Sequence, residues 1–182
     1  FHGRSSSERE VGLVLPLFGR ANVRSYRAPL TQSPGFAWFL NTGIGTAIPQ
    51  SLATETAKVR TWIAADTGRR LPWLCGFSNG AAMAANLCLE DPDAYAGLIM
   101  LGGCFAVHDE ALPPGRLAEK SVLFCRGRSD TVIPRQKFEQ AQRYLTGPSG
   151  ARTQLLDYDG GHELPLTIGP AVRAWLNQVE MN

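Results

Sequence analysis

The sequence contains no run of about 18 apolar residues, the shortest stretch that commonly crosses a bilayer as a helix. It also lacks an excess of one charge, because 18 basic residues face 16 acidic ones and leave a formal net charge of +2. No basic run stands out of the kind that nucleic-acid-binding surfaces usually carry. We therefore expect neither a membrane span nor a nucleic-acid partner.

Cysteine is scarce, and the four cysteines show no C-x-x-C spacing, the pattern that zinc and redox sites typically use. We expect no metal and no cofactor. Cys75, Cys88, Cys104 and Cys125 lie in or beside apolar stretches, so we interpret them as buried free thiols. Free thiols favour a reducing compartment, which makes a cytoplasmic location the expectation.

The chain begins with Phe1-His2-Gly3 and lacks the charged region and apolar run of a signal peptide. Because a protein chain normally begins with Met, we expect residues upstream of Phe1, and a signal peptide there stays open. The 182 residues have 44% hydrophobic and 19% charged residues, which is typical of a globular domain. No repeat or Pro/Gly/Ser linker divides them, so we expect one domain over residues 1–182.

Apolar runs alternate with helical patterns, which predicts βαβ units around a mostly parallel sheet with helices on both faces. The predicted strands are residues 23–27, 71–76, 96–101, 121–125 and 153–158. The predicted helices are residues 7–17, 52–67, 81–89, 134–145 and 168–179. The sequence thus indicates an α/β fold.

Gly76-Phe77-Ser78-Asn79-Gly80 lies between a predicted strand and a predicted helix. This G-x-S-x-G pattern in that context is typical of a nucleophile elbow, a sharp turn that exposes the serine hydroxyl. The turn crowds the residues two before and two after the serine, where glycine fits best. We predict that Ser78 is a nucleophile rather than part of an ordinary turn.

A serine hydroxyl needs an adjacent base, which a third group must orient. His162 lies on a glycine-flanked loop after the last predicted strand, at the edge where parallel sheets carry their chemistry. We predict that it is the base. His2 and His108 are the other histidines, and we expect His108 to be a surface or pocket-rim residue.

The orienting acid is predicted to be Asp130, which follows the apolar strand at 121–125. Asp157 and Asp159 are rivals, but they lie at the end of the strand that leads to His162 and would have to fold back on it. Two backbone N–H groups should receive the oxyanion. We expect them to belong to Asn79, at a helix N-terminus, and to Arg4, in the loop that follows Phe1-His2-Gly3.

Five segments together resemble the phospholipase/carboxylesterase family of α/β-hydrolases, which includes acyl-protein thioesterases and small bacterial carboxylesterases. They are Phe-His-Gly at the start, Arg27-Ala28-Pro29 before Trp38-Phe39, Gly-Phe-Ser-Asn-Gly, Gly-Arg-Ser-Asp130 with Ile133-Pro134, and Gly-Gly-His162. The resemblance implies an α/β-hydrolase fold, a triad of Ser78, Asp130 and His162, and the Arg4 and Asn79 amides as oxyanion hole. It implies hydrolysis of esters or thioesters without a cofactor, and it leaves a homodimer open.

Two features depart from the family pattern. Relatives usually carry a second glycine soon after the His-Gly turn, where this chain has Arg4-Ser5-Ser6-Ser7, and their early strands are absent here. The alternative functions are a non-catalytic small-ligand binding protein on the same fold and an acyltransferase or dienelactone-hydrolase-like enzyme. Serine rather than cysteine at the elbow argues against the dienelactone-hydrolase type.

The connection at 102–120 is too short for a cap domain, so we expect an open site. Residues 28–51 form the other long connection, and we expect one side of the cleft to be lined by its apolar residues Phe36, Trp38, Phe39, Leu40 and Ile44. We expect Trp38 and Phe39, together with Phe77 of the elbow, to contact substrate, although aromatic residues are also common in plain core. An open, shallow site predicts a preference for short to medium acyl chains.

Overall fold

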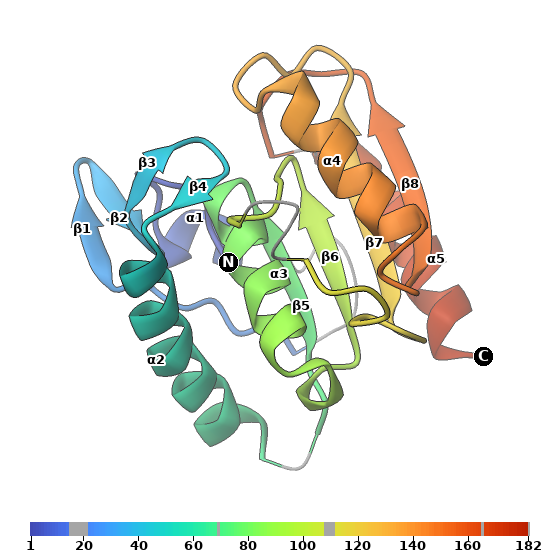
Figure 1. The fold of residues 1–182 in the computed structure, drawn as a ribbon, viewed down its shortest axis with the longest axis horizontal. Helices are drawn as coiled ribbons and strands as arrows, with labels where there is room; N and C mark the ends of the chain where they lie inside the picture. The colour runs from blue at the N-terminus through green and yellow to red at the C-terminus, as the bar shows by residue number, and fades with distance from the viewer. Residues whose placement is uncertain (15–21, 69, 108–111, 165, 182) are drawn as a thin grey trace.

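The structure is a computed structural model that describes residues 1–14, 22–68, 70–107, 112–164 and 166–181. A parallel sheet runs through the middle of the molecule (Figure 1). Its strands are β5 (Trp73–Phe77), β6 (Gly97–Leu101), β7 (Ser121–Gly127) and β8 (Arg152–Tyr158), which are adjacent in the order β5-β6-β7-β8. All three neighbouring pairs are parallel.

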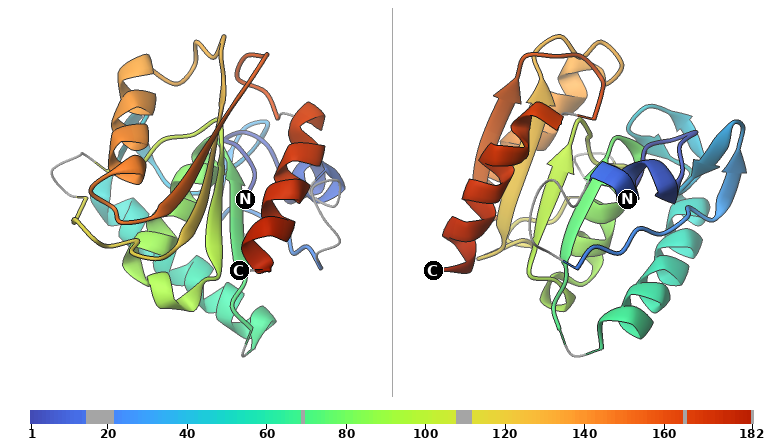
Figure 2. Two further views of the ribbon diagram at one scale, coloured as in Figure 1. Left: turned by 90° about the vertical axis from the view of Figure 1, so that its right-hand side faces the viewer. Right: turned by 180° about the vertical axis from the view of Figure 1, so that it is seen from behind.

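Helices cover both faces of this sheet, as Figure 2 shows with the sheet edge-on. On one face lie α2 (Pro49–Thr67), α3 (Asn79–Glu90) and α4 (Arg135–Thr146), whose apolar side chains share one core with the strands. On the other face lie α1 (Glu8–Val14) and α5 (Gly169–Glu180), which pack in a second cluster through Val11, Val172 and Trp175. The predicted α/β fold without a cap domain is confirmed.

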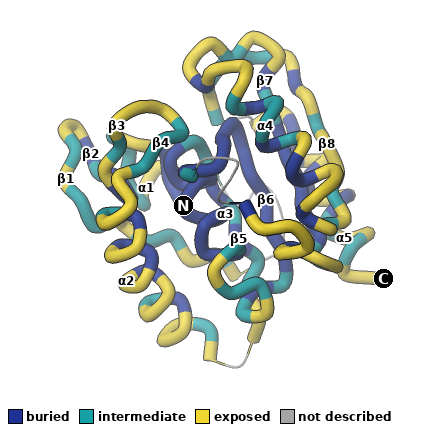
Figure 3. The backbone as a smooth tube through the Cα atoms, in the orientation of Figure 1, coloured by how far each residue is buried: buried dark blue, intermediate teal, exposed yellow. Residues whose placement is uncertain are grey.

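The centre of the sheet is the most deeply buried part of the chain (Figure 3). All five residues of β6 are buried, because it has a strand on each side and a helical layer on each face. Strands in that position read as continuous apolar runs, which is why Gly97-Leu-Ile-Met-Leu101 was recognisable in the sequence. Helix α3 is almost as buried, and its alanines allow it to pack closely on β5 and β6.

The four strands and four of the five helices begin and end within a few residues of their predicted bounds. The fifth, predicted at 7–17, is observed as α1 up to Val14, and residues 15–17 lie outside the described residues. Two short 3₁₀ helices, η2 (Pro92–Ala94) and η4 (Leu166–Ile168), complete the helical elements of the described chain.

The predicted strand at 23–27 is wrong, because residues 22–28 form no secondary structure. Its side chains bind neighbouring helices: the Ser25 hydroxyl donates to the Glu8 carbonyl at 2.9 Å, and the Tyr26 hydroxyl donates to Asp66 at 2.8 Å. Arg27 forms an ion pair with Glu8 at 2.7 Å. The segment is therefore held by side chains and not by a strand ladder.

Two small antiparallel hairpins follow, where a connection without strands was expected. They are β1 (Leu30–Gln32) with β2 (Gly35–Ala37), and β3 (Asn41–Gly43) with β4 (Thr46–Ala47). Both hairpins lie beside α2, at one side of the large sheet (Figure 1). Beside β5, the Phe1 amine donates to the Cys75 carbonyl at 2.7 Å and the Phe77 N–H donates to the Phe1 carbonyl at 3.0 Å.

Among the described residues, no helix is both long enough and apolar enough to span a membrane. The described residues also include no group of three or more His, Cys, Asp or Glu side chains placed to hold a metal ion.

Candidate active site

Ser78 lies on the sharp turn between β5 and α3, with φ 53° and ψ −118°. A positive φ is uncommon for a residue with a side chain and marks a strained backbone. A Cβ on Gly76 would collide with the Gly80 carbonyl, and a Cβ on Gly80 would collide with the carbonyl oxygens of Phe1 and His2. Glycine is therefore required at both positions for this turn to form.

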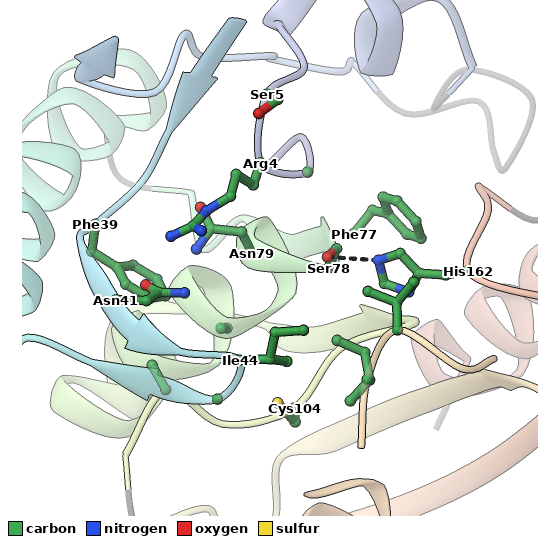
Figure 4. Close-up of a pocket in the computed structure, with 16 residues that line it drawn as sticks. Arg4, Ser5, Phe39, Asn41, Ile44, Phe77, Ser78, Asn79, Cys104 and His162 are labelled. Carbon is green, nitrogen blue, oxygen red and sulfur yellow. Dashed lines mark hydrogen bonds between the residues drawn. The ribbon is translucent and has the colours of Figure 1, made fainter. Parts of the chain in front are cut away.

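His162 lies against Ser78, from the loop after β8 (Figure 4). Its Nε2 is 2.9 Å from Ser78 Oγ, and its Nδ1 is 2.8 Å from Asp130 Oδ2. Because a carboxylate only accepts, Nδ1 carries the proton and Nε2 is left as the acceptor for the serine hydroxyl. The Phe77 ring packs on the imidazole with centroids 5.0 Å apart, which helps to fix the ring plane.

Asp130 is held by the backbone of its own loop, between β7 and α4. Its Oδ1 accepts hydrogen bonds from the N–H groups of Val132 at 2.9 Å and Ile133 at 3.0 Å, while Oδ2 faces His162. The side chain is fully buried. The carboxylate is thus desolvated, oriented and available to one imidazole nitrogen.

The rival carboxylates are bound elsewhere. Asp157 forms a bidentate ion pair with Arg126, whose Nη2 and Nε donate to the carboxylate oxygens at 2.8 and 3.2 Å. Asp159 is exposed and forms an ion pair with Arg128. Of the two other histidines, His2 is completely buried away from Ser78 Oγ, and His108 lies outside the described residues.

Among the backbone donors near Ser78, the N–H groups of Arg4 and Asn79 have no acceptor within the described part of the chain. Asn79 begins α3, so its N–H lies at the positive end of the helix dipole. Both residues line the same cleft as Ser78 and His162. Unpaired donors beside the serine are suited to receive a negatively charged oxygen.

His2 fixes the direction of one of these donors. Its Nδ1 is 2.7 Å from the Gly3 carbonyl, and its Nε2 accepts from the Ala28 N–H at 3.1 Å, so the proton is on Nδ1. The Gly3 carbonyl and the Arg4 N–H belong to one planar peptide and point in opposite directions. Holding the carbonyl therefore aims the N–H. Burial lowers the pKa of His2, which favours the neutral ring that this arrangement needs.

The cleft around Ser78 has a volume of about 340 Å³, at the lower end of the usual range for small-molecule sites. Phe39 and Phe77 line it, as expected for substrate contacts. Trp38 does not. Its side chain is fully buried, its Nε1 donates to the His2 carbonyl at 2.8 Å, and it belongs to the core that supports the cleft.

Ile44 also lines the cleft, as expected, whereas Phe36 and Leu40 do not. Several lining residues were not predicted, and those from the β3–β4 hairpin and from the loops after β6 and β7 are Asn41, Gly45, Cys104, Ala106, Val132 and Ile133. Those from the loops lie at the carboxyl edge of the parallel sheet, a position that the strand predictions could have indicated. The hairpin residues carried no comparable signal.

The cysteines are free thiols, and all except the partly buried Cys75 are buried, which largely confirms their interpretation. Burial raises the pKa of Cys75, Cys88 and Cys104 to about 11 and raises that of Cys125 further. Cys104 is the cysteine that lines the cleft, and at neutral pH its thiol stays protonated. Ser78 is thus the better placed nucleophile.

Comparison with known proteins gives the family of this chain. Residues 37–178 match the Phospholipase/Carboxylesterase family, and the chain belongs to it. A Bacillus subtilis protein named "Putative hydrolase MhqD" is 26% identical over 184 residues, which cover 97% of this chain and 90% of that protein.

Solved structures show the same fold. The Bacillus cereus carboxylesterase superposes with a TM-score of 0.85 at 20% identity, covering 98% of this chain and 85% of the other. Acyl-protein thioesterase 2 of Zea mays superposes with a TM-score of 0.74 at 18% identity, covering 98% of this chain and 90% of the other. The chain is therefore similar in fold to both carboxylesterases and a thioesterase.

Proposed function

We propose that this protein is a serine hydrolase that cleaves carboxylic esters or thioesters through an acyl-enzyme, with Ser78 as nucleophile. The observation that carries the proposal is the hydrogen-bonded chain from Ser78 through His162 to buried Asp130, next to two unpaired backbone N–H groups. Family membership supports hydrolysis as the reaction type.

In the first half-reaction, His162 Nε2 takes the hydroxyl proton while Ser78 Oγ attacks the carbonyl carbon. The carbonyl oxygen becomes an oxyanion, which the N–H groups of Arg4 and Asn79 receive. Nε2 then gives the proton to the leaving alcohol or thiol as its bond to the carbonyl carbon breaks. Asp130 stays ionised and stabilises the imidazolium that forms between these steps.

In the second half-reaction, water replaces the leaving group. His162 Nε2 takes a proton from the water while its oxygen attacks the acyl carbon, and the oxyanion forms at the same place. The Ser78 oxygen then leaves with the proton from Nε2, and the carboxylic acid is released. No cofactor takes part in this sequence.

Labelling with a fluorophosphonate probe tests the mechanism, because an activated serine reacts with it covalently. We expect one label per chain on Ser78 and loss of esterase activity in proportion to labelling. A chain that stays unlabelled and hydrolyses neither esters nor thioesters would instead be a small-ligand binding protein. A labelled chain that passes its acyl group to an added alcohol faster than to water would be an acyltransferase.

The size of the cleft supports a preference for short to medium acyl chains. Its lining includes Phe39, Ile44 and Val132, and each buried methylene adds up to about 0.8 kcal/mol until the cleft is full. A series of 4-nitrophenyl esters from acetate to palmitate measures this. Maximal activity on long chains, or activity that appears only with micelles, would contradict it.

A further inference from the structure

Several hydrogen-bond donors lie at one end of the cleft. Figure 4 shows the side chains of Arg4, Asn41 and Asn79 directed toward one another, on the side of Ser78 away from His162. All three line the cleft. The proposed hydrolysis uses only the backbone N–H groups of Arg4 and Asn79, so these side chains are free for a second role.

The Asn79 side chain supplies a buried donor that has no partner. The residue is 8% exposed, and its Oδ1 accepts from the Trp38 N–H at 2.9 Å. That bond fixes which way the amide faces, because the opposite orientation would set Nδ2 against another donor. Nδ2 is then left buried without an acceptor in the described residues. An unpaired buried amide is costly, so an acceptor from a ligand would relieve it.

The Arg4 side chain supplies a positive charge that no carboxylate of the described residues pairs with. Among the described residues that line the cleft, Arg4 alone is permanently charged. The two nearest carboxylates in sequence are engaged elsewhere, Glu8 with Arg27 at 2.7 Å and Glu10 with the Ser6 hydroxyl at 2.7 Å. No ion pair of Arg4 occurs within the described chain.

Asn41 holds the guanidinium in place. In the amide orientation that suits both neighbours, its oxygen accepts from Arg4 Nη2 at 3.3 Å and its nitrogen donates to the Leu40 carbonyl at 3.2 Å. A neutral acceptor on one nitrogen leaves the other guanidinium donors, and the full charge, for a ligand.

The position of His162 decides which part of a substrate would reach these donors. The leaving group must lie beside His162 Nε2, which protonates it, so the acyl group extends to the other side of Ser78. That side holds Arg4, Asn41 and Asn79 (Figure 4). We propose that this end of the cleft binds a carboxylate on the acyl chain, so that preferred substrates are monoesters or monothioesters of short dicarboxylic acids. The inference rests on the proposed function.

Matched substrates test it. Monoethyl glutarate and monoethyl adipate are compared with ethyl pentanoate and ethyl hexanoate, and ethanol release gives kcat/KM for each. Because charge-assisted hydrogen bonds are stronger than neutral ones, we expect the acidic esters to be favoured by roughly ten- to hundredfold. A preference for the neutral esters would overturn the inference while leaving the hydrolase intact.

Variants locate the effect in the side chains. Arg4→Met keeps the backbone N–H and should reduce the ratio of acidic to neutral kcat/KM by at least about tenfold, with partial recovery in Arg4→Lys. Asn79→Asp keeps the acceptor for Trp38 and puts a negative oxygen in place of Nδ2, so it should reverse the ratio. Arg24→Met, at an exposed arginine outside the cleft, is the matched control. Equal ratios in Arg4→Met and Arg24→Met would refute the proposal.

A binding measurement separates this inference from the proposed function. Calorimetry with monoethyl glutarate on Ser78→Ala needs no turnover, and adding Arg4→Met to that variant should weaken binding by roughly tenfold or more. Loss of binding on Arg4→Met in a protein that hydrolyses no ester would support the subsite and refute the hydrolase. Unchanged binding would refute the subsite, whether or not the protein is an esterase.

Discussion

The cleft joins two regions of the molecule that are built differently. One is the sheet region, from β5 to α5, in which parallel strands and their helices bury a continuous core. The other is the N-terminal region, residues 1–47, whose described part consists of one short helix, two hairpins of two to three residues per strand, and extended chain. The sheet region carries the three side chains of the proposed triad, whereas the N-terminal region adds a proposed oxyanion donor and part of the lining of the cleft.

The difference shows how each region holds its functional groups. In the sheet region, Ser78, Asp130 and His162 follow neighbouring or nearby strands, so the order of the strands brings them together. In the N-terminal region, single hydrogen bonds from buried side chains, such as those of His2 and Trp38, set the path of the chain. Changes at the triad in the sheet region should therefore abolish catalysis. Changes in the N-terminal region should lower the catalytic rate by smaller factors.

The largest effect is expected from Ser78→Ala. Removing the nucleophile of a triad lowers turnover by about a millionfold, while alanine is small enough for the strained turn. Steady-state hydrolysis and the unfolding transition of the purified variant measure the two properties. His162→Gln should be about as severe, because the two residues act as one unit. Wild-type-like activity of Ser78→Ala would refute the mechanism.

A smaller loss is expected from Asp130→Asn. The amide would favour the wrong imidazole tautomer and lower kcat by about ten-thousandfold. Asp159→Asn is the matched control, since Asp159 is exposed and pairs with Arg128, and it should change kcat only a few fold. If the two variants ranked the other way round, the orienting acid would be misassigned.

A still smaller loss of kcat is expected when His2 is substituted. These variants test whether the N-terminal region affects the rate without abolishing it. Losing one oxyanion donor costs about a hundredfold or more in kcat, and a loosened donor should cost less. His2→Asn places an amide near Nδ1 and can still bind the Gly3 carbonyl, whereas His2→Gln reaches the Nε2 position and loses that bond. We expect His2→Gln to have the lower kcat at similar stability, and equal kcat values would show that His2 does not aim the Arg4 N–H.

The smallest effect is expected from Ser5→Gly. Ser5 has φ 61°, in the left-handed region that costs roughly 1–2 kcal/mol for a residue with a side chain. Glycine removes that strain, but its greater freedom in the unfolded chain costs roughly 0.5–1 kcal/mol of stability, so unfolding in urea should show a net gain of up to about 1.5 kcal/mol. Ser7→Gly, at a position without a positive φ, should show no gain.

The contrast between the regions also explains what the sequence could predict. Strands β6 and β7 were recognisable because buried parallel strands need nearly uninterrupted apolar residues, and Ser78 was recognisable because its turn needs Gly76 and Gly80. The hairpins were missed because strands such as Leu30-Thr31-Gln32 are too short to show a period.

Single residues of the N-terminal region were equally hard to interpret. Trp38 and Phe39 are adjacent aromatic residues of the same buried core, yet only Phe39 also lines the cleft. Ser5 has φ 61°, a left-handed backbone conformation that favours glycine, and nothing in Arg4-Ser5-Ser6-Ser7 indicates it. Asn79 was predicted for its N–H alone, while its side chain also supports Trp38.

Gly80 lies in backbone contact with Phe1 and His2. The turn that carries Ser78 therefore cannot shift relative to the N-terminal segment that carries the Arg4 N–H. A site assembled in this way before substrate arrives needs no closing motion in order to react. Acylation should then begin without a lag on mixing, with a burst of released alcohol that equals the number of active sites whenever deacylation is the slower step. The rate of substrate capture would depend on the approach to an open cleft, and not on the opening of a gate.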